Sequence, residues 1–219
     1  PIQAEAEEYK TLVFSQNKYE LDKTTIDALK NRFIAFDLET TGFSPCNARI
    51  VAIGAHIFEN GVVVESFSSL INPGMHIPKS ASAVNHITDA MVSSEPTEDV
   101  VLDDFVLFLG DALYEGTYLC AHNASFDIKF ISEALSRNHI SANINYVDTL
   151  NLSRKTINLD NYKLGTVAEY FGIMQESEHR AADDALVCGN ILCKLIAEKE
   201  KQIAQDQKYK DERKSRGTD

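Results

Sequence analysis

Hydrophobic and polar positions in the first third of the chain follow the pattern of an antiparallel sheet. The apolar run at residues 33–36 predicts a short strand, and further strands are expected at about 50–58 and 62–71. Asn60 and Gly61 separate the last two strands, and this dipeptide is a strong signal for a hairpin turn. The pattern therefore predicts a meander of three antiparallel strands.

Beyond this meander, strands and helices alternate. The expected elements are a helix near 100–109, a buried strand at 117–121, a helix capped by Ser125 that runs to about Asn138, a short strand at 145–148, a helix at 163–171 that ends at Gly172, and a long helix from 181 to about 201. Three hairpin strands followed by alternating strands and helices predict an α/β domain with a mixed sheet flanked by helices.

Both ends of the chain differ from the middle. Residues 1–31 are polar and mixed in charge, with some apolar residues at helical spacing, and are predicted to be a peripheral N-terminal extension. Residues 198–219 alternate basic and acidic side chains and are predicted to be a solvated helix end followed by disorder. The folded domain is accordingly expected over residues 32–197.

Composition narrows the class of protein. The chain has 219 residues and a formal net charge of −12, which at first argues against nucleic acid because proteins that bind phosphates are usually basic. No apolar run approaches the ~20 residues of a membrane span, so no membrane partner is expected. The N-terminus lacks the layout of a signal peptide, and the four cysteines are scattered, so a cytoplasmic protein without a zinc site is predicted.

Candidate chemistry begins with Asp37 and Glu39, which follow the first apolar strand. Residues i and i+2 of a strand point to the same face, so both carboxylates are expected to project together at the end of that strand. Taken alone, the pattern is also typical of two solvated acids at a strand terminus.

Two further acids stand near the starts of helices. Asp127 falls in the first turn of a helix, where an acid also suits the helix dipole without any catalytic role. Asp184 shares a helical stripe with the apolar residues Val187, Cys188 and Ile191, so it is expected to point inward. A buried carboxylate requires a cation or a proton. His179 alone would be interpreted as a surface or capping histidine.

These acids become informative together. Carboxylates that converge repel one another, and divalent cations would remove that penalty. Ligation by oxygen without cysteine favours Mg²⁺ or Mn²⁺ over zinc. Two such ions in one site form the arrangement that catalyses displacement at phosphorus.

The segments FDLETTG, AHNASFD and HRAADD, in this order, resemble the three motifs of the DEDD-type 3′→5′ exonucleases. A histidine five residues before the last aspartate is typical of the histidine subclass (DEDDh-type, DnaQ-like). This subclass includes the proofreading subunit of bacterial DNA polymerase III, the exonuclease domain of the Gram-positive replicative polymerase, ribonuclease T and oligoribonuclease. The resemblance covers residues 32–197, and one departure is His86, where the family often has glycine.

The resemblance implies a ribonuclease H-like fold and a role for each motif residue. It implies that Asp37, Glu39 and Asp184 bind a first metal ion and that Asp37 and Asp127 bind a second. It implies that His179 is the general base. It also implies that the backbone at Leu38, Thr40 and Thr41 meets the terminal nucleotide and that Asn123 or Phe126 lines the pocket of this nucleotide. The product would be a nucleoside 5′-monophosphate, and two Mg²⁺ or Mn²⁺ would be the cofactors.

The expected substrate is a single-stranded 3′ end, with DNA favoured over RNA. An RNA 3′ exonuclease similar to ribonuclease T or oligoribonuclease is the alternative, because the motifs do not report on the 2′-OH. A non-catalytic nucleic-acid-binding module is a further alternative, although such a module would be expected to have lost one of the five motif residues. A DNA polymerase subunit or domain is the expected protein partner. Two divalent ions would offset part of the negative charge, so the charge does not exclude nucleic acid.

Overall fold

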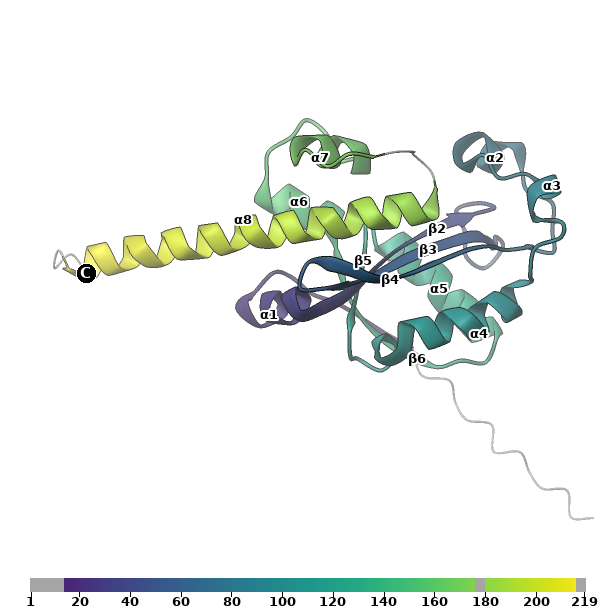
Figure 1. Cartoon of the computed structure of the whole chain (residues 1–219), viewed down its shortest axis with the longest axis horizontal. Coiled ribbons are helices and arrows are strands. Elements are labelled where there is room, and N and C mark those ends of the chain that lie inside the picture. Colours follow the sequence, from purple (N-terminus) through teal and green to yellow (C-terminus); the bar gives the residue numbers. More distant parts are fainter. Residues whose placement is uncertain (1–13, 176–179, 216–219) are drawn as a thin grey trace, which may run out of the picture.

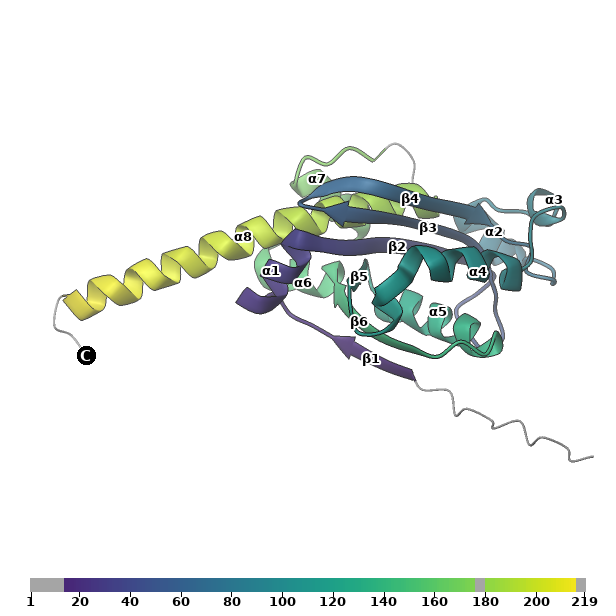
Figure 2. The same cartoon turned by 60° about the horizontal axis from the view of Figure 1, so that its bottom comes forward.

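The computed structural model describes residues 14–175 and 180–215. These residues form an α/β domain around a six-stranded sheet with the strand order β1-β6-β5-β2-β3-β4 (Figures 1 and 2). Helices cover both faces of the sheet, and one helix continues well beyond it (Figure 1). The predicted mixed sheet flanked by helices is confirmed.

One half of the sheet is the predicted antiparallel meander. Strands β2 (Arg32–Thr40), β3 (Ile50–Glu59) and β4 (Val62–Leu70) pair in antiparallel fashion, in sequence order. Asn60 and Gly61 join β3 to β4 with φ angles of 51° and 78°. Positive φ at both central residues is typical of a type I′ turn, which matches the twist of the flanking strands.

The other half of the sheet is parallel. Strand β5 (Tyr118–Ala121) pairs with β2, β6 (Ala142–Asp148) pairs with β5, and β1 (Phe14–Lys18) pairs with β6. Strand β2 therefore lies in the interior of the sheet, between β3 and β5. Its acidic end lies at the carboxyl edge of a parallel pair, where open α/β sheets usually place their sites.

The prediction of a peripheral N-terminal extension is wrong for the described part of residues 1–31. Strand β1 extends the sheet at one edge, and helix α1 (Lys23–Asn31) buries Ile26 and Leu29 in the core, together with Leu21 before it. The hydrophobic pattern did not predict β1, because the sequence of this strand, FSQNK, is mostly polar. The strand is held by pairing with β6 and by side-chain amides and hydroxyls that bond across the two strands.

The remaining helices lie on the two faces of the sheet, except for the two short helices within residues 79–92, which lie beyond one end of the meander strands (Figure 1). They are α2 (Lys79–Asn85), α3 (Asp89–Val92), α4 (Glu98–Leu109), the 3₁₀ turn η1 (Gly110–Leu113), α5 (Ser125–Arg137), α6 (Thr149–Thr156), α7 (Leu164–Tyr170) and α8 (Ala181–Ser215).

Each face of the sheet carries its own hydrophobic core. Ile34 and Phe36 of β2 pack in the core that contains α4 and α5, whereas Phe33 and Ala35 pack in the core that contains α1, α6 and α8. Burial on both faces explains why β2 appears in the sequence as a continuous apolar run rather than as an alternating one. It also fixes β2 firmly, which matters because this strand carries two of the motif acids.

Helix α8 is longer than the pattern predicts. It continues to Ser215, so the disorder expected after about residue 201 is wrong for residues 202–215. Mixed charges support the exposed part of the helix, as in the pair Lys201–Glu198 and the bond from Gln207 to Asp211. Within the described ranges, no helix combines the length and the apolar character needed to cross a bilayer.

The start of α5 also differs from the prediction. Ala124 is the N-cap with helical φ and ψ, and Ser125 is the first helical residue, without a capping bond from its side chain. The chain enters the helix through Asn123, which has a φ of 67°. Because Ala124 is already helical, the hydroxyl of Ser125 lies one position too late to cap the helix.

Candidate active site

Three carboxylates from two distant parts of the chain converge at the end of β2. Asp37 and Glu39 project from this strand, and Asp184 joins them from the first turn of α8. One oxygen from each carboxylate lies within 4.8 Å of the others. The predicted common face for Asp37 and Glu39 and the predicted inward orientation of Asp184, which is only 7 % exposed, are confirmed.

The first turn of α8 packs closely against β3 because β3 has no side chain at the point of contact. Gly54 lies opposite Asp37 in the β2–β3 register, and a Cβ atom there would lie 2.1 Å from the backbone nitrogen of Ala182. Only glycine fits against this helix turn. Gly54 was not among the predicted site residues, although a glycine inside an apolar strand is a recognised sign of close backbone approach.

A buried histidine fastens the same helix turn to the sheet. His56 of β3 lies 2.8 Å from the carbonyl oxygen of Ala182 through Nε2 and 2.8 Å from the hydroxyl of Ser66 through Nδ1. Since a carbonyl oxygen only accepts, Nε2–H is the donor, and Nδ1 accepts from the hydroxyl of Ser66. His56 and Gly54 thus hold the first turn of α8 beside the acids of β2. His56 was not among the predicted site residues either, since a single histidine in an apolar strand carries no motif.

The fourth acid, Asp127, lies in the first turn of α5 and is 3 % exposed. It is not one of the three carboxylates within 4.8 Å of one another. It nevertheless lies close enough for its charge to raise the pKa of Asp37. The backbone at Leu38 on β2 lies near enough to Asp127 to offset part of the rise in the pKa of this carboxyl that burial causes.

Burial and mutual repulsion set the protonation of these acids. Burial, followed by the charges of the neighbouring carboxylates, raises the pKa of Asp37 well above its ordinary value. Burial raises the pKa of Glu39 to about 8, with a further contribution from Asp184. Burial likewise raises the pKa of Asp127. The ionised cluster is therefore unfavourable unless cations compensate for its charge.

The donor set fits divalent metal ions. No basic side chain in the described ranges forms an ion pair with Asp37, Glu39 or Asp127. Carboxylate oxygens are the ligands that Mg²⁺ and Mn²⁺ prefer. A buried acidic cluster with raised pKa values is what a divalent ion would stabilise, since the ion favours the ionised carboxylates.

A cavity of about 240 Å³ adjoins these acids on the side of α2 and α5. Leu38, Thr40 and Phe126, three of the residues implied to contact substrate, line this cavity together with Glu39. Phe43 lies at the same cavity with its side chain 92 % exposed, although the sequence analysis did not select it. An aromatic ring presented to solvent beside an acidic cluster suits contact with a flat ligand.

Two other residues implied to contact substrate have structural partners. The hydroxyl of Thr41 accepts a hydrogen bond from the backbone N–H of Arg49, and Thr41 is 4 % exposed. The backbone N–H of Asn123 donates to the carboxylate of Asp148 at the end of β6. Neither residue lines the cavity beside Phe126.

His86 has a left-handed backbone with a φ of 59°, at the C-cap of α2. Glycine adopts this conformation without strain, which accounts for its frequent presence here in the family that the motifs resemble. His86 lines a further cavity of about 580 Å³, which also contains Glu39 and Arg180. The adjacent Asn85 donates to the carbonyl of Thr40 and thereby ties this turn to β2.

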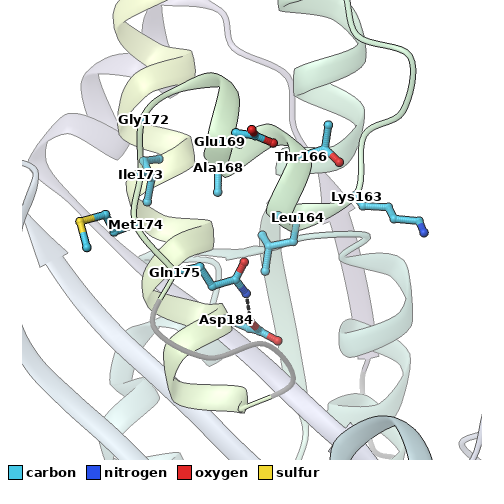
Figure 3. A pocket seen from close by; sticks show the side chains of 11 residues that line it. Lys163, Leu164, Thr166, Ala168, Glu169, Gly172, Ile173, Met174, Gln175 and Asp184 are labelled. Carbon is cyan, nitrogen blue, oxygen red and sulfur yellow. Dashed lines mark hydrogen bonds between the residues drawn. The ribbon is translucent and has the colours of Figure 1, made fainter.

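On the opposite side of the cluster, α7 and the segment after it enclose a cavity of about 980 Å³ (Figure 3). Asp184 lines it, and the side-chain amide of Gln175 donates to Asp184 Oδ1 at 2.7 Å. His179, the implied general base, lies outside the described residues.

Comparisons with known proteins agree with this geometry. The model of the exonuclease family RNase_T matches residues 34–192. A DNA polymerase III PolC-type from Clostridium perfringens is 38 % identical over 167 residues, which are 76 % of this chain and 11 % of that protein. A DNA polymerase III subunit epsilon from Treponema pallidum is 37 % identical over 176 residues, which are 78 % of this chain and 79 % of that protein. The chain thus spans only about a tenth of the PolC-type relative.

Solved structures share the fold. The structure of exonuclease X in complex with 5′ overhanging duplex DNA is 25 % identical and has a TM-score of 0.56. The match covers 76 % of this chain and 90 % of that one. The complex of Escherichia coli exonuclease I with single-stranded DNA is 17 % identical and has a TM-score of 0.68, covering 82 % of this chain and 43 % of that one. The second likeness concerns the fold alone.

Proposed function

Because the chain belongs to this exonuclease family, we propose that it is a metal-dependent 3′→5′ exonuclease that releases nucleoside 5′-monophosphates from single-stranded DNA. The observation that carries the proposal is the convergence of Asp37, Glu39 and Asp184, with Asp127 close by, at the end of an interior strand. No structural need explains four acids at one place, since their mutual repulsion raises their pKa values and disfavours the ionised state.

In this proposal, Asp37, Glu39 and Asp184 hold one divalent ion, and Asp37 with Asp127 holds a second. Bound Mg²⁺ or Mn²⁺ would supply the charge that activates a water molecule and stabilises the phosphate and the leaving 3′ oxygen. The chain's own contribution is to keep these carboxylates in place, through the doubly buried β2 and through the contact of α8 with Gly54.

His179 is proposed as the general base that takes the proton from the attacking water. Histidine is the side chain whose unperturbed pKa lies nearest to neutral pH, and a positioned base contributes ~10²–10⁴ in rate. The role rests on the motif HRAADD rather than on any contact, because residues 176–179 lie outside the described ranges.

The substrate assignment to DNA is supported by the relatives, which are named DNA polymerase III, and by neighbours solved with DNA. Leu38, Thr40 and Phe126 would contact the terminal nucleotide in the cavity that adjoins Glu39. A polymerase partner is proposed on the same grounds. Since the chain has a net charge of −12, we expect weak intrinsic affinity for nucleic acid, with processivity supplied by that partner.

The proposal is tested by a time course on matched DNA and RNA oligonucleotides, labelled at the 5′ or the 3′ end, with Mn²⁺ or with excess EDTA. We expect a 5′-labelled DNA strand to shorten stepwise and a 3′ label to appear at once as a mononucleotide. Activity in excess EDTA would contradict the metal requirement. Faster cleavage of the RNA strand would instead assign the enzyme to RNA ends.

The role of His179 has its own test. His179→Ala should lower kcat by ~10²–10⁴ with little change in the binding of the oligonucleotide, because a general base acts in the transition state. An equal loss of kcat and of binding would argue against a general-base role.

A further inference from the structure

We propose that Gln175 is a positioning residue of this site, whose side-chain amide holds the carboxylate of Asp184 in the orientation that binds a divalent cation. This inference rests on the proposed metal site and assigns a function to a residue outside the three motifs. It concerns the one member of the three-carboxylate cluster that does not come from β2.

The chain brings Gln175 to Asp184 by a sharp reversal after α7. Gly172, with a φ of 66°, stands just beyond the end of α7, and residues 173–175 lead from it down to Asp184 (Figure 3). Figure 3 shows the amide of Gln175 directed at Asp184 on the floor of the cavity. The distance from Nε2 to Oδ1 is 2.7 Å, which is short for a neutral donor and typical of a hydrogen bond to a carboxylate.

The three carboxylates differ in how their backbones are held. Asp37 and Glu39 belong to a strand that pairs with β3 at both positions and whose two faces are covered by hydrophobic cores. Asp184 belongs to the first turn of a helix, and this turn is held against β3 by Gly54 and His56. A hydrogen bond from Gln175 removes rotational freedom of the carboxylate that would otherwise have to be lost when an ion binds.

The chemistry of the donor suits this task. An amide donates a hydrogen bond without adding charge, so it orients Asp184 and leaves the negative charge of the cluster available to a cation. A lysine or arginine at the same place would compete with the ion for the carboxylate. Hydrogen bonds to metal ligands from residues that do not touch the metal are typically worth 10- to 100-fold in affinity.

The test is a direct measurement of Mn²⁺ binding to the full chain in the absence of nucleic acid, by electron paramagnetic resonance of free Mn²⁺. Gln175→Met keeps the length of the side chain and removes the donor, whereas Gln175→Ala removes both. Met174→Ala is the matched control, since Met174 is the adjacent residue, lines the same cavity and is 88 % exposed. Thermal unfolding in EDTA checks that each variant is folded.

We expect both Gln175 variants to raise the Kd for Mn²⁺ about tenfold while Met174→Ala binds as the wild type does. The Mn²⁺ concentration for half-maximal nucleotide release should rise by the same factor, with kcat at saturating Mn²⁺ within about threefold of the wild type. If Gln175→Met binds Mn²⁺ as tightly as the wild type, the amide has no positioning role and the inference is wrong.

The outcome separates this inference from the proposed function. Wild-type protein that releases nucleotides while Gln175→Met binds Mn²⁺ normally would overturn the role of Gln175 alone. Wild-type protein that binds Mn²⁺ but releases no nucleotide would overturn the proposed activity, and weaker binding in the variants would still support the role of Gln175. Wild-type protein that binds no Mn²⁺ would overturn both.

Discussion

Buried acids lie at the ends of β6 and β2, the two strands on either side of β5. The two sites differ in whether the protein supplies hydrogen-bond donors or a positive charge to the carboxylates. At the end of β6, Asp148 is 2 % exposed and accepts hydrogen bonds from the backbone N–H groups of Asn123 and Leu150 and from the side-chain amide of Asn151. The ammonium group of Lys18 lies 3.4 Å from its second oxygen. At the end of β2, the acids face mainly one another.

The difference lies in whether the protein itself supplies the groups that compensate a buried acid. Asp148 is satisfied by groups of the protein itself, so it needs nothing from solution. Asp37 and Glu39 are surrounded by other carboxylates, and their raised pKa values express that conflict. A site of the second kind costs stability unless an external cation completes it, which is a cost more typical of functional sites than of structural ones.

The largest effect expected from this comparison is on activity. Asp37→Asn should reduce nucleotide release at least about a thousandfold, equivalent to about 4 kcal/mol on the barrier, because it removes the carboxylate shared by both proposed ions. Asp148→Asn should leave the activity of the folded protein within about threefold. The check is initial rates on a 3′-labelled oligonucleotide at saturating Mg²⁺. Similar losses in both variants would mean that the two sites are not functionally distinct.

The free energy of unfolding should fall more in Asp148→Asn than in Asp37→Asn, which is the opposite of the order expected for activity. Asp148→Asn weakens several charge-assisted hydrogen bonds in a buried place and should lower the free energy of unfolding by about 2 kcal/mol. Asp37→Asn should raise the stability of the metal-free protein near neutral pH, because it removes a carboxyl group whose ionisation is disfavoured by burial and by the neighbouring acids. Urea unfolding in EDTA measures both. A loss of stability in Asp37→Asn would show that its charge is already compensated within the protein.

The pH dependence of unfolding should come from the β2 site. Burial raises the pKa of Asp37, Glu39 and Asp127 above the unfolded values, so these acids favour the folded state at low pH. This contribution is lost as pH rises through the folded pKa, which is about 8 for Glu39.

Accordingly, the Tm in EDTA should fall between about pH 5 and about pH 8, by a few degrees, and Mg²⁺ should reduce the fall. Asp37→Asn should flatten this dependence, and Asp148→Asn should leave its slope unchanged. A Tm in EDTA that rises over the same interval would contradict the assigned direction of these pKa shifts.

The smallest expected effect concerns Lys18. Its side chain is 36 % exposed and lies 3.4 Å from Asp148, so Lys18→Met should cost at most about 1 kcal/mol in urea unfolding. The hydrogen bonds from Asn123, Leu150 and Asn151 would remain. A loss larger than that of Asp148→Asn would show that the lysine, rather than these bonds, stabilises the carboxylate.

Much of the fold could be predicted because the signals are local. The meander follows from apolar runs around Asn60 and Gly61, and the motif acids could be assigned to strand or helix from their neighbours. Strand β1 could not be predicted, because a polar edge strand is selected by its partner rather than by its own pattern. The length of α8 was underestimated because alternating charges suit a solvated helix as well as a disordered tail.

Side-chain type and spacing along one element are local properties, so the candidate acids Asp37, Glu39 and Asp184 could be selected from the order of residues alone. Their convergence could not be selected in this way, because the approach of Asp184 to Asp37 depends on the packing of α8 across β3 at Gly54 and His56. The same holds for Gln175, which no spacing rule connects to Asp184. Convergence of distant segments is set by packing, and packing is a property of the whole chain.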